Sequence, residues 1–231
     1  MTQRTDHRRP KVAAFDVVGT LFSLEPLRLR LKEAGFSETA LGEWFSRFLH
    51  ASVSLDVADV FVPFREVAIA TLEVMAAESG LPSSKSMAEK IMQGLSELPA
   101  HPDVRPAFQG LLDAGIRIMA LTNGNAQTTQ HLLKQAALEG FVDRIVSIEE
   151  IRHWKPRTEV YLHAANVAGV PPGQMCLVAA HAWDILGANH AGLLTAWVAR
   201  KEKKFHSAMG APDVTGESLT DVVATLIALP A

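Results

Sequence analysis

The sequence predicts an α/β fold in which a parallel sheet is interrupted by a helical insertion. Three observations support this prediction. A short apolar strand, Val12–Phe15, comes first and ends at Asp16. Residues 24 to 98 then show helical patterns with little β-like sequence. From Asp103 onward helical and strand patterns alternate, as in sheets built from right-handed crossovers.

The first strand leads directly into a tight turn. Four small or apolar residues precede Asp16, which suits a strand buried on both faces. Gly19 supplies a turn that lifts the Asp16 side chain into the crevice at the carboxyl end of the sheet. Asp16 is therefore the candidate nucleophile.

The insertion is expected to contain four helices separated by glycine and proline breaks. Four helices of this length make a small bundle. The predicted organisation is a core domain of residues 1–22 and 99–231, with residues 23–98 forming a helical cap. The expected cap helices are Leu27–Ala34, Thr39–Val53, Phe64–Ser79 and Ser86–Leu95.

The segment after Asp103 is expected to complete the sheet and to gather catalytic groups at its carboxyl edge. No internal repeats or low-complexity segments interrupt it. The expected strands are Ile116–Leu121, Arg144–Ile148, Met175–Ala179 and Leu194–Val198, and the expected helices are Val104–Ala114, Ala126–Ala137, Glu159–Ala168, Trp183–Ala191 and one within Ser218–Leu229.

Composition narrows the class of protein. At 231 residues and 48% hydrophobic content, the chain can bury a large core. A net charge of −3 gives no basic field for nucleic acid or an anionic membrane, and no apolar run reaches the roughly 18 residues of a membrane span. The basic residues 1–10 look like a loose tail without a cleavable signal. The single Cys176, in an apolar stretch, fits the core of a cytoplasmic protein.

Two further strand ends carry polar groups. Thr122, Asn123 and Gly124 follow one strand and offer a hydroxyl, an amide and a helix N-terminus, a suitable cradle for an anion. The competing interpretation is an ordinary turn with a helix cap. Lys155 precedes another helix, where a cation beside Asp16 would keep the carboxylate ionised and oriented. Tyr161, the only tyrosine, is either a site residue or a core side chain.

These motifs, taken in order, resemble the haloacid dehalogenase (HAD) superfamily, and within it the L-2-haloacid dehalogenase (type II) subgroup. The carriers of the resemblance are the run from Asp16 to Thr20, Thr122-Asn123-Gly124, Lys155 with Tyr161, and Ala182-Trp183-Asp184. The resemblance implies a HAD-like Rossmannoid core with an inserted cap. It also implies that Asp16 is the nucleophile, that Lys155 pairs with it, and that Tyr161 and Trp183 belong to the site.

The resemblance also separates two chemistries within the superfamily. HAD phosphatases carry a second Asp two residues after the nucleophile and another in the fourth motif, whereas this chain has Val18 and Ala180 there. Asp16 and Asp184 alone are a poor ligand set for Mg²⁺. We therefore expect no metal and no cofactor, and a bond to halogen as the target.

Three residues depart from the dehalogenase pattern. His181 stands where the subgroup has Asn, and could act as a base or as a hydrogen-bond donor. Phe45 stands where the subgroup carries a cap Arg that helps bind halide. Arg47 is a possible substitute, but two residues along a helix rotate it by about 200° from position 45. The competing interpretation is that Arg47 is solvated.

The expected activity is hydrolysis of short 2-haloalkanoic acids to 2-hydroxy acids through an ester on Asp16. Thr122 would hold the substrate carboxylate, Asn123 would face the halide, and Thr20 would stabilise charge on the acyl oxygen. Asp184 or His181 would activate water. Two alternatives stay open, a HAD phosphatase for small phosphate esters and a catalytically silent HAD-fold binding protein. Partners are the 2-halocarboxylate and halide, with a homodimer implied by the resemblance.

Overall fold

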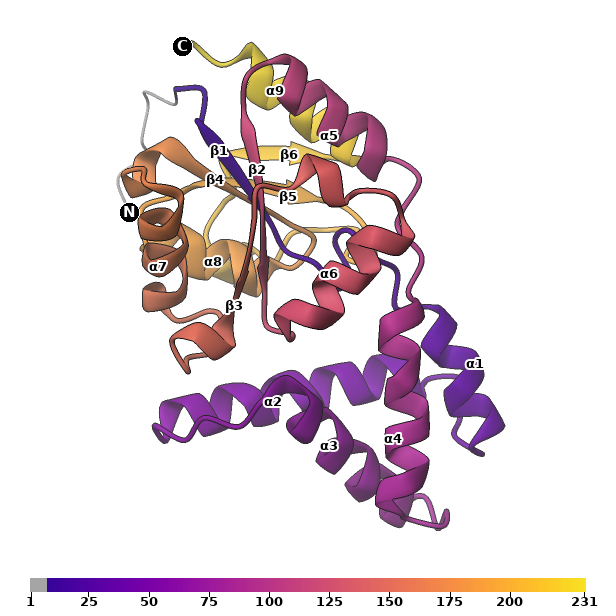
Figure 1. Cartoon of the computed structure of the whole chain (residues 1–231). Coiled ribbons are helices and arrows are strands. Elements are labelled where there is room, and N and C mark those ends of the chain that lie inside the picture. Colours follow the sequence, from indigo (N-terminus) through magenta and orange to yellow (C-terminus); the bar gives the residue numbers. More distant parts are fainter. Residues whose placement is uncertain (1–7) are drawn as a thin grey trace.

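A computed structural model describes residues 8–231 and confirms the predicted α/β fold (Figure 1). Residues 1–7, which hold most of the predicted tail, lie outside the described part. Six strands form one sheet in the order β3-β2-β1-β4-β5-β6, and every pairing is parallel. The strands are β1 (Val12–Phe15), β2 (Arg117–Thr122), β3 (Arg144–Ser147), β4 (Met175–Ala179), β5 (Leu194–Val198) and β6 (Val214–Gly216).

The strand order reverses at β1, which pairs with β2 on one side and with β4 on the other. In doubly wound sheets the crevice at such a reversal is where ligands bind, outside the carboxyl ends of the strands. Asp16 comes directly after β1, and Ala180 directly after β4. The topology therefore places the first and fourth sequence motifs at one switch point.

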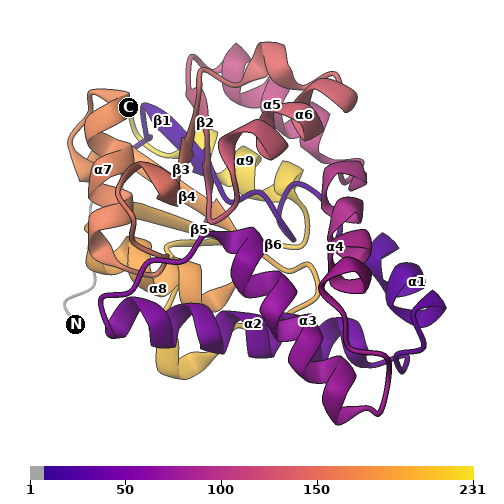
Figure 2. The same ribbon diagram turned by 60° about the horizontal axis from the view of Figure 1, so that its bottom comes forward.

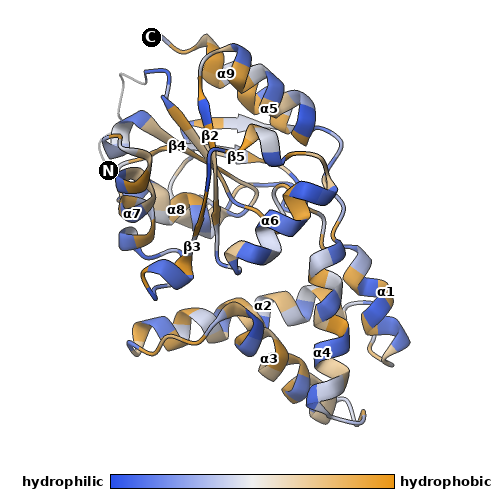
Figure 3. Cartoon of the chain, in the orientation of Figure 1, coloured by the Kyte–Doolittle hydropathy of each residue, from blue (hydrophilic) through white to orange (hydrophobic). Residues whose placement is uncertain are grey.

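Helices cover both faces of the sheet. Helices α5, α6 and α9 lie on one face, and α7 and α8 pack together on the other (Figure 1). Figure 3 shows mostly hydrophobic strands between helices whose colours alternate, as expected for amphipathic helices over a buried parallel sheet. The bounds are α5 (Val104–Asp113), α6 (Ala126–Gln135), α7 (Thr158–Ala168), α8 (Ala182–His190) and α9 (Leu219–Ala228).

The helical insertion between β1 and β2 lies across the carboxyl edge of the sheet (Figures 1 and 2). Its helices contact one another in a closed set, α1 with α2, α2 with α3, α3 with α4, and α4 with α1. Trp44 is fully buried, and its indole N–H donates to the Ala68 carbonyl at 3.1 Å. The helices are α1 (Pro26–Glu33), α2 (Ala40–Val57), α3 (Phe64–Glu78) and α4 (Lys85–Gln93).

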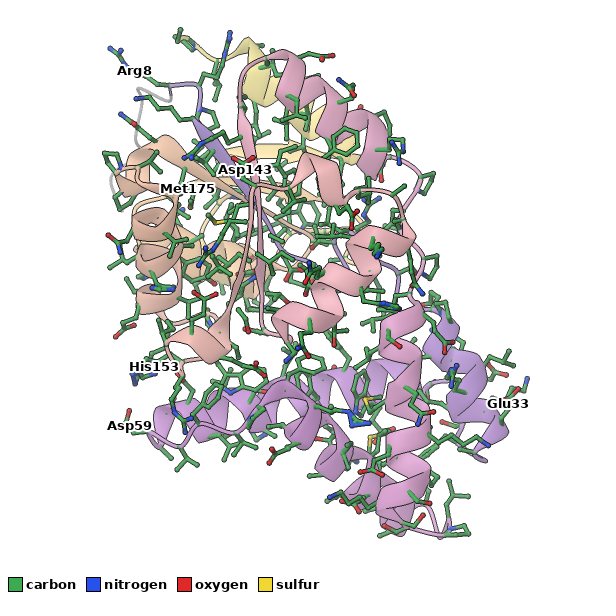
Figure 4. All side chains as sticks on the ribbon, viewed as in Figure 1. Arg8, Glu33, Asp59, Asp143, His153 and Met175 are labelled. Carbon is green, nitrogen blue, oxygen red and sulfur yellow. The ribbon has the colours of Figure 1, made fainter. Side chains whose placement is uncertain are left out.

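The C-terminal end of α2 is tied to the core by a buried carboxylate. Asp56 accepts hydrogen bonds from the Trp154 backbone N–H at 3.0 Å and from His153 Nδ1 at 3.3 Å, and pairs with Arg157 Nε at 3.0 Å. We call this set the Asp56 clamp. Figure 4 shows His153 beside Asp59 at this junction. The clamp joins the insertion to the loop that carries Lys155.

Most predicted elements agree with the structure to within a residue or two, with two larger differences. Helix α2 continues to Val57, four residues beyond its predicted end, because Asp56 in its last turn bonds to the core. Strand β6 was not predicted, since Val214–Gly216 is too short to show alternation. Cys176 is buried in β4. Within residues 8–231 no helix combines the length and apolarity needed to cross a membrane.

Candidate active site

The loop after β1 presents a carboxylate whose two oxygens are separately bonded. Thr20 Oγ1 donates to Asp16 Oδ2 at 2.7 Å, and Lys155 Nζ donates to Asp16 Oδ1 at 3.2 Å. Gly19 takes a positive φ of 91°, which lets the chain turn back under the carboxylate. Thr20 also accepts from the Ala180 backbone N–H at 2.9 Å, which joins the β1 and β4 loops. Asp16, 6% exposed, is therefore held rigidly.

Lys155 bridges two carboxylates that come from distant parts of the chain. Its Nζ donates to Asp184 Oδ2 at 2.9 Å as well as to Asp16, and its side chain has no exposed surface. Tyr161 donates from its hydroxyl to Asp184 Oδ1 at 2.6 Å. Asp184 is thus fully buried with both oxygens bonded. One ammonium therefore joins the two carboxylates, Asp16 after β1 and Asp184 in α8.

Burial and mutual charge set the protonation states of this network. Burial acts to lower the pKa of Lys155, but the charges of Asp184 and Asp16 outweigh it and raise that pKa, so the ammonium stays charged. Burial raises the pKa of Asp184, with Lys155 opposing. Burial and the Asp184 charge also raise the pKa of Tyr161. A carboxylate with a raised pKa is a stronger base than an ordinary aspartate.

The loop after β2 lies beside Asp16 on the opposite side from β4. Thr122 is 2% exposed, and its Oγ1 accepts from the Gly124 backbone N–H at 2.9 Å. Asn123 uses its carbonyl oxygen to accept from the Lys155 backbone N–H at 3.1 Å. Its amide NH₂ is therefore the end available to an anion. Asn125 caps α6 by accepting from the Thr128 N–H at 3.1 Å, which is the helix cap of the competing interpretation.

His181 begins α8 and stacks between two rings of the site. Its ring centroid lies 5.4 Å from that of Phe45 and 5.6 Å from that of Trp183. Nδ1 hydrogen-bonds to Glu202 Oε1 at 3.3 Å. Burial acts to lower the pKa of His181, but the Glu202 hydrogen bond and the charges of Asp16, Glu202 and Asp184 raise it. His181 is thus better suited to donate a hydrogen bond than to accept a proton.

Asp16, Thr122, Asn123 and His181 enclose a chamber with aromatic rings from α2 and α3. Its volume is about 20 Å³, room for about one water molecule. The predicted Phe45 and Trp183 both line it. The full lining is Asp16, Val18, Phe45, Phe48, Leu49, Phe64, Thr122, Asn123, Gly124, His181 and Trp183.

Arg47 is not brought to the chamber. It pairs with Glu43 and Glu78 on the outer surface of the insertion, and its side chain is 41% exposed. This corrects the possibility that Arg47 replaces a cap Arg, because the helical rotation turns it away from Phe45, which points inward. Arg47 is the solvated residue of the competing interpretation.

Two functional neighbours were missed by the sequence reasoning. Glu202 lies in the loop after β5 and bonds both His181 and the Ala182 N–H at the start of α8. Arg200, in the same loop, donates to the Thr20 carbonyl and pairs with Asp103 at 2.8 Å. Their position after a predicted strand was the available signal, but the charged run of residues 200–204 also fits a solvated loop.

No group of three or more His, Cys, Asp or Glu side chains suited to a metal ion occurs within the described residues. A family model described as haloacid dehalogenase-like hydrolase matches residues 10–192. The chain belongs to this family. As noted for the sequence motifs, the superfamily also contains phosphatases. Membership of the family alone therefore does not define the substrate.

Three proteins similar to this haloacid dehalogenase-like hydrolase are 2-haloacid dehalogenases. The chain is 28% identical over 193 residues to (S)-2-haloacid dehalogenase 4A of Burkholderia cepacia, covering 83% of this chain and 84% of that protein. It is 27% identical to (S)-2-haloacid dehalogenase 1 of Pseudomonas sp. (strain CBS-3), covering 84% and 86%. The crystal structure of an L-2-haloacid dehalogenase superposes with a TM-score of 0.88 at 26% identity, covering 97% of this chain and 100% of that one.

Proposed function

We propose that the protein hydrolyses short 2-haloalkanoic acids to 2-hydroxy acids. One observation carries the proposal: Asp16 lies at the wall of a small chamber lined by aromatic rings, with one oxygen on Lys155 and the other on Thr20. A carboxylate held in this way is shielded from solvent and oriented for attack on carbon. The similarity to 2-haloacid dehalogenases over more than four fifths of the chain supports the same substrate class.

The first step is a displacement at the α-carbon. An Asp16 oxygen forms a bond to that carbon in line with the carbon–halogen bond, whose electron pair leaves with the halide. The product of this step is an ester on Asp16. Thr122 and the NH₂ of Asn123 are positioned on the chamber wall to bind the substrate carboxylate and the halide.

The second step is hydrolysis of the ester. Water attacks the acyl carbon of Asp16 and the acyl carbon–oxygen bond of the ester breaks, so the bond to the substrate carbon is kept and one inversion survives. Asp184, whose pKa is raised by burial and which shares Lys155 with Asp16, takes a proton from this water and returns it to the oxygen of the departing 2-hydroxy acid. Thr20 stabilises the charge on the acyl oxygen. His181, also considered as the base, is the weaker choice because its pKa is raised and Nδ1 faces Glu202.

The phosphatase alternative has less support from the site. Val18 lines the chamber where a phosphatase of the superfamily carries a second carboxylate, and it offers no proton to a leaving alkoxide. Ala180 likewise supplies only backbone. Halide leaves without a proton, so neither substitution impairs dehalogenation.

Three further parts of the proposal concern the setting of the reaction. Residues 23–98 act as a cap domain over a core of residues 1–22 and 99–231, and they move to admit substrate, because a chamber of about 20 Å³ holds no haloacid. The enzyme works in the cytoplasm, consistent with a single buried cysteine. It acts as a homodimer, as expected from the resemblance to the dehalogenases.

The test is halide release from chloroacetate and 2-chloropropionate, beside a panel of phosphate esters with and without Mg²⁺. Asp16→Asn should abolish release without unfolding the protein, while Asp143→Asn at an exposed position should leave it unchanged. A single turnover in ¹⁸O-water should give an unlabelled product hydroxyl, because that oxygen comes from Asp16. Label in this first product, or activity on phosphate esters alone, would refute the proposal.

A further inference from the structure

Two buried ring nitrogens at the chamber have no hydrogen-bond partner among the described residues. They are Nε2 of His181 and Nε1 of Trp183, and both side chains line the chamber beside Asp16. The rings are stacked, with 10° between their planes. Buried polar atoms are normally hydrogen-bonded, so two unpartnered ones in one wall point to a ligand that accepts from both.

The neighbours of His181 determine what kind of ligand this is. Nδ1 faces the Glu202 carboxylate and therefore carries a proton, so Nε2 is a second donor when the ring is charged. Glu202 also accepts from the Ala182 N–H at 3.2 Å, which holds its carboxylate in place at the start of α8. The Trp183 indole N–H is a donor at any pH. Two donors and one positive charge suit an anion.

The space on the other side of His181 carries charges of both signs. A cavity of about 450 Å³ shares Phe45 and His181 with the chamber, and its charged lining residues are Arg200, Lys201, Lys203, Glu25 and Glu217. His181 therefore stands between this cavity and Asp16. On the chamber side, the charges of Asp16 and Asp184 act to raise the pKa of the imidazole.

The position of the imidazole depends on Gly19. A Cβ at this residue would lie 2.7 Å from His181 Nε2, closer than any real contact. The ring thus lies directly over the turn that presents Asp16. An anion bound to Nε2 is held next to the reacting carbon and not at a remote surface.

We propose that His181 and Trp183 form an anion-binding wall of the chamber beside Thr122 and Asn123, with Glu202 as the residue that positions His181. The ligand is the halide or the carboxylate of the substrate, both of which are anionic acceptors. The identity of this anion rests on the proposed function, whereas the anion site itself rests on the contacts of His181 and Trp183. In this proposal the positive charge at this wall comes from His181, a residue of the core. The insertion supplies none, because Phe45 is uncharged and Arg47 pairs with Glu78 on the outer surface.

The experiment measures equilibrium binding of bromide and of propionate by titration calorimetry, without turnover. His181→Gln removes the charge, Glu202→Gln removes its partner, and Lys203→Gln is the control for the general field of the outer cavity. We expect His181→Gln to weaken binding about tenfold or more, as for loss of a charge-assisted hydrogen bond, and Lys203→Gln to change it little. If His181→Gln weakens only bromide binding, the ligand of this site is the halide. If it weakens only propionate binding, the ligand is the substrate carboxylate.

The pH dependence provides a readout that a purely structural role would not change. In the wild type, binding should tighten as pH falls and the imidazole becomes charged, and in Glu202→Gln the midpoint should move to lower pH. The charged and titratable groups around the ring are Glu202, Asp16 and Asp184, and in the outer cavity Arg200, Lys201, Lys203, His101, Glu25 and Glu217.

Two results separate this proposal from the proposed function. Equal bromide and propionate affinities in the wild type, His181→Gln and Glu202→Gln would overturn the anion site even if the enzyme releases halide. An equal loss in Lys203→Gln would also overturn it, because binding would then reflect only the general field. Histidine-dependent anion binding by a protein that releases no halide would support the site and refute the dehalogenase function.

Discussion

Gly187 offers a test of how closely α8 must approach α7. The residue lies within α8, one turn after Asp184, and a Cβ there would lie 2.5 Å from the Pro156 carbonyl oxygen and 2.6 Å from both Cε2 and the hydroxyl of Tyr161. One of these atoms is backbone and the others belong to a fully buried ring. Neither can move away easily, so Gly187→Ala forces α8 outward or displaces Tyr161.

Two opposing effects decide the size of the change. Replacing glycine by alanine inside a helix stabilises it by about 1 kcal/mol. Overpacking costs about 1–3 kcal/mol, and three close contacts place this site near the upper end. We expect Gly187→Ala to lower the free energy of unfolding by about 2 kcal/mol. For a chain of this length that corresponds to a fall in Tm of roughly 4–8 °C.

Gly110 is the matched control because it also lies inside a helix, α5, but in open surroundings. A Cβ there would lie 3.5 Å from Val223 Cγ1, an ordinary contact. Gly110→Ala should therefore gain about 1 kcal/mol from helix propensity alone. Thermal unfolding followed by circular dichroism compares the two variants. A Gly187→Ala protein as stable as the wild type or as Gly110→Ala would refute the packing argument.

Three other predictions follow from the site. EDTA should leave halide release unchanged, and a loss of activity restored by Mg²⁺ would contradict the ligand argument. Tyr161→Phe removes a hydrogen bond to the buried Asp184 and should cost about 1.5–3 kcal/mol in thermal unfolding; it should also slow ester hydrolysis more than halide release, which a pre-steady-state burst measures. Burial acts to raise the pKa of Asp103, but Arg200 and the Leu219 N–H hold it below its usual 3.8. This lowered pKa stabilises the fold above about pH 4. The stabilisation is lost as the pH falls through the pKa of Asp103 in the folded protein. Asp103→Asn should therefore lose less stability than the wild type on acidification, and equal slopes in acid titration would count against this.

The sequence was sufficient for the elements with strong local patterns. Apolar runs such as Met175–Ala179 predict buried strands, and the alternation of strands with helices predicts a parallel sheet whose carboxyl edge holds Asp16, Lys155 and Asp184. Topology alone brings these residues together. The prediction needed no knowledge of distances because every strand end in such a sheet lies at the same edge.

The features that the sequence did not predict depend on contacts between residues far apart in the chain. Glu202 and Arg200 look like surface charges, and only the fold shows that one meets His181 and the other meets Thr20. The last turn of α2 is similar, since Asp56 gains its role from a loop about 98 residues later. Arg47 shows the opposite case, because helical geometry already indicated that it faces away.

The Asp56 clamp bears on when Asp16 can react with compounds other than its substrate. Asp56 bonds to the backbone of Trp154, the residue immediately before Lys155, so α2 and the loop that carries the ammonium are mechanically connected. If the insertion moves as the proposed cap, the same motion would pull on the loop that holds Lys155 against Asp16. Asp16 would then be fully oriented only after closure. An exposed Asp16 would be least reactive at the moment when stray alkylating agents reach it most easily.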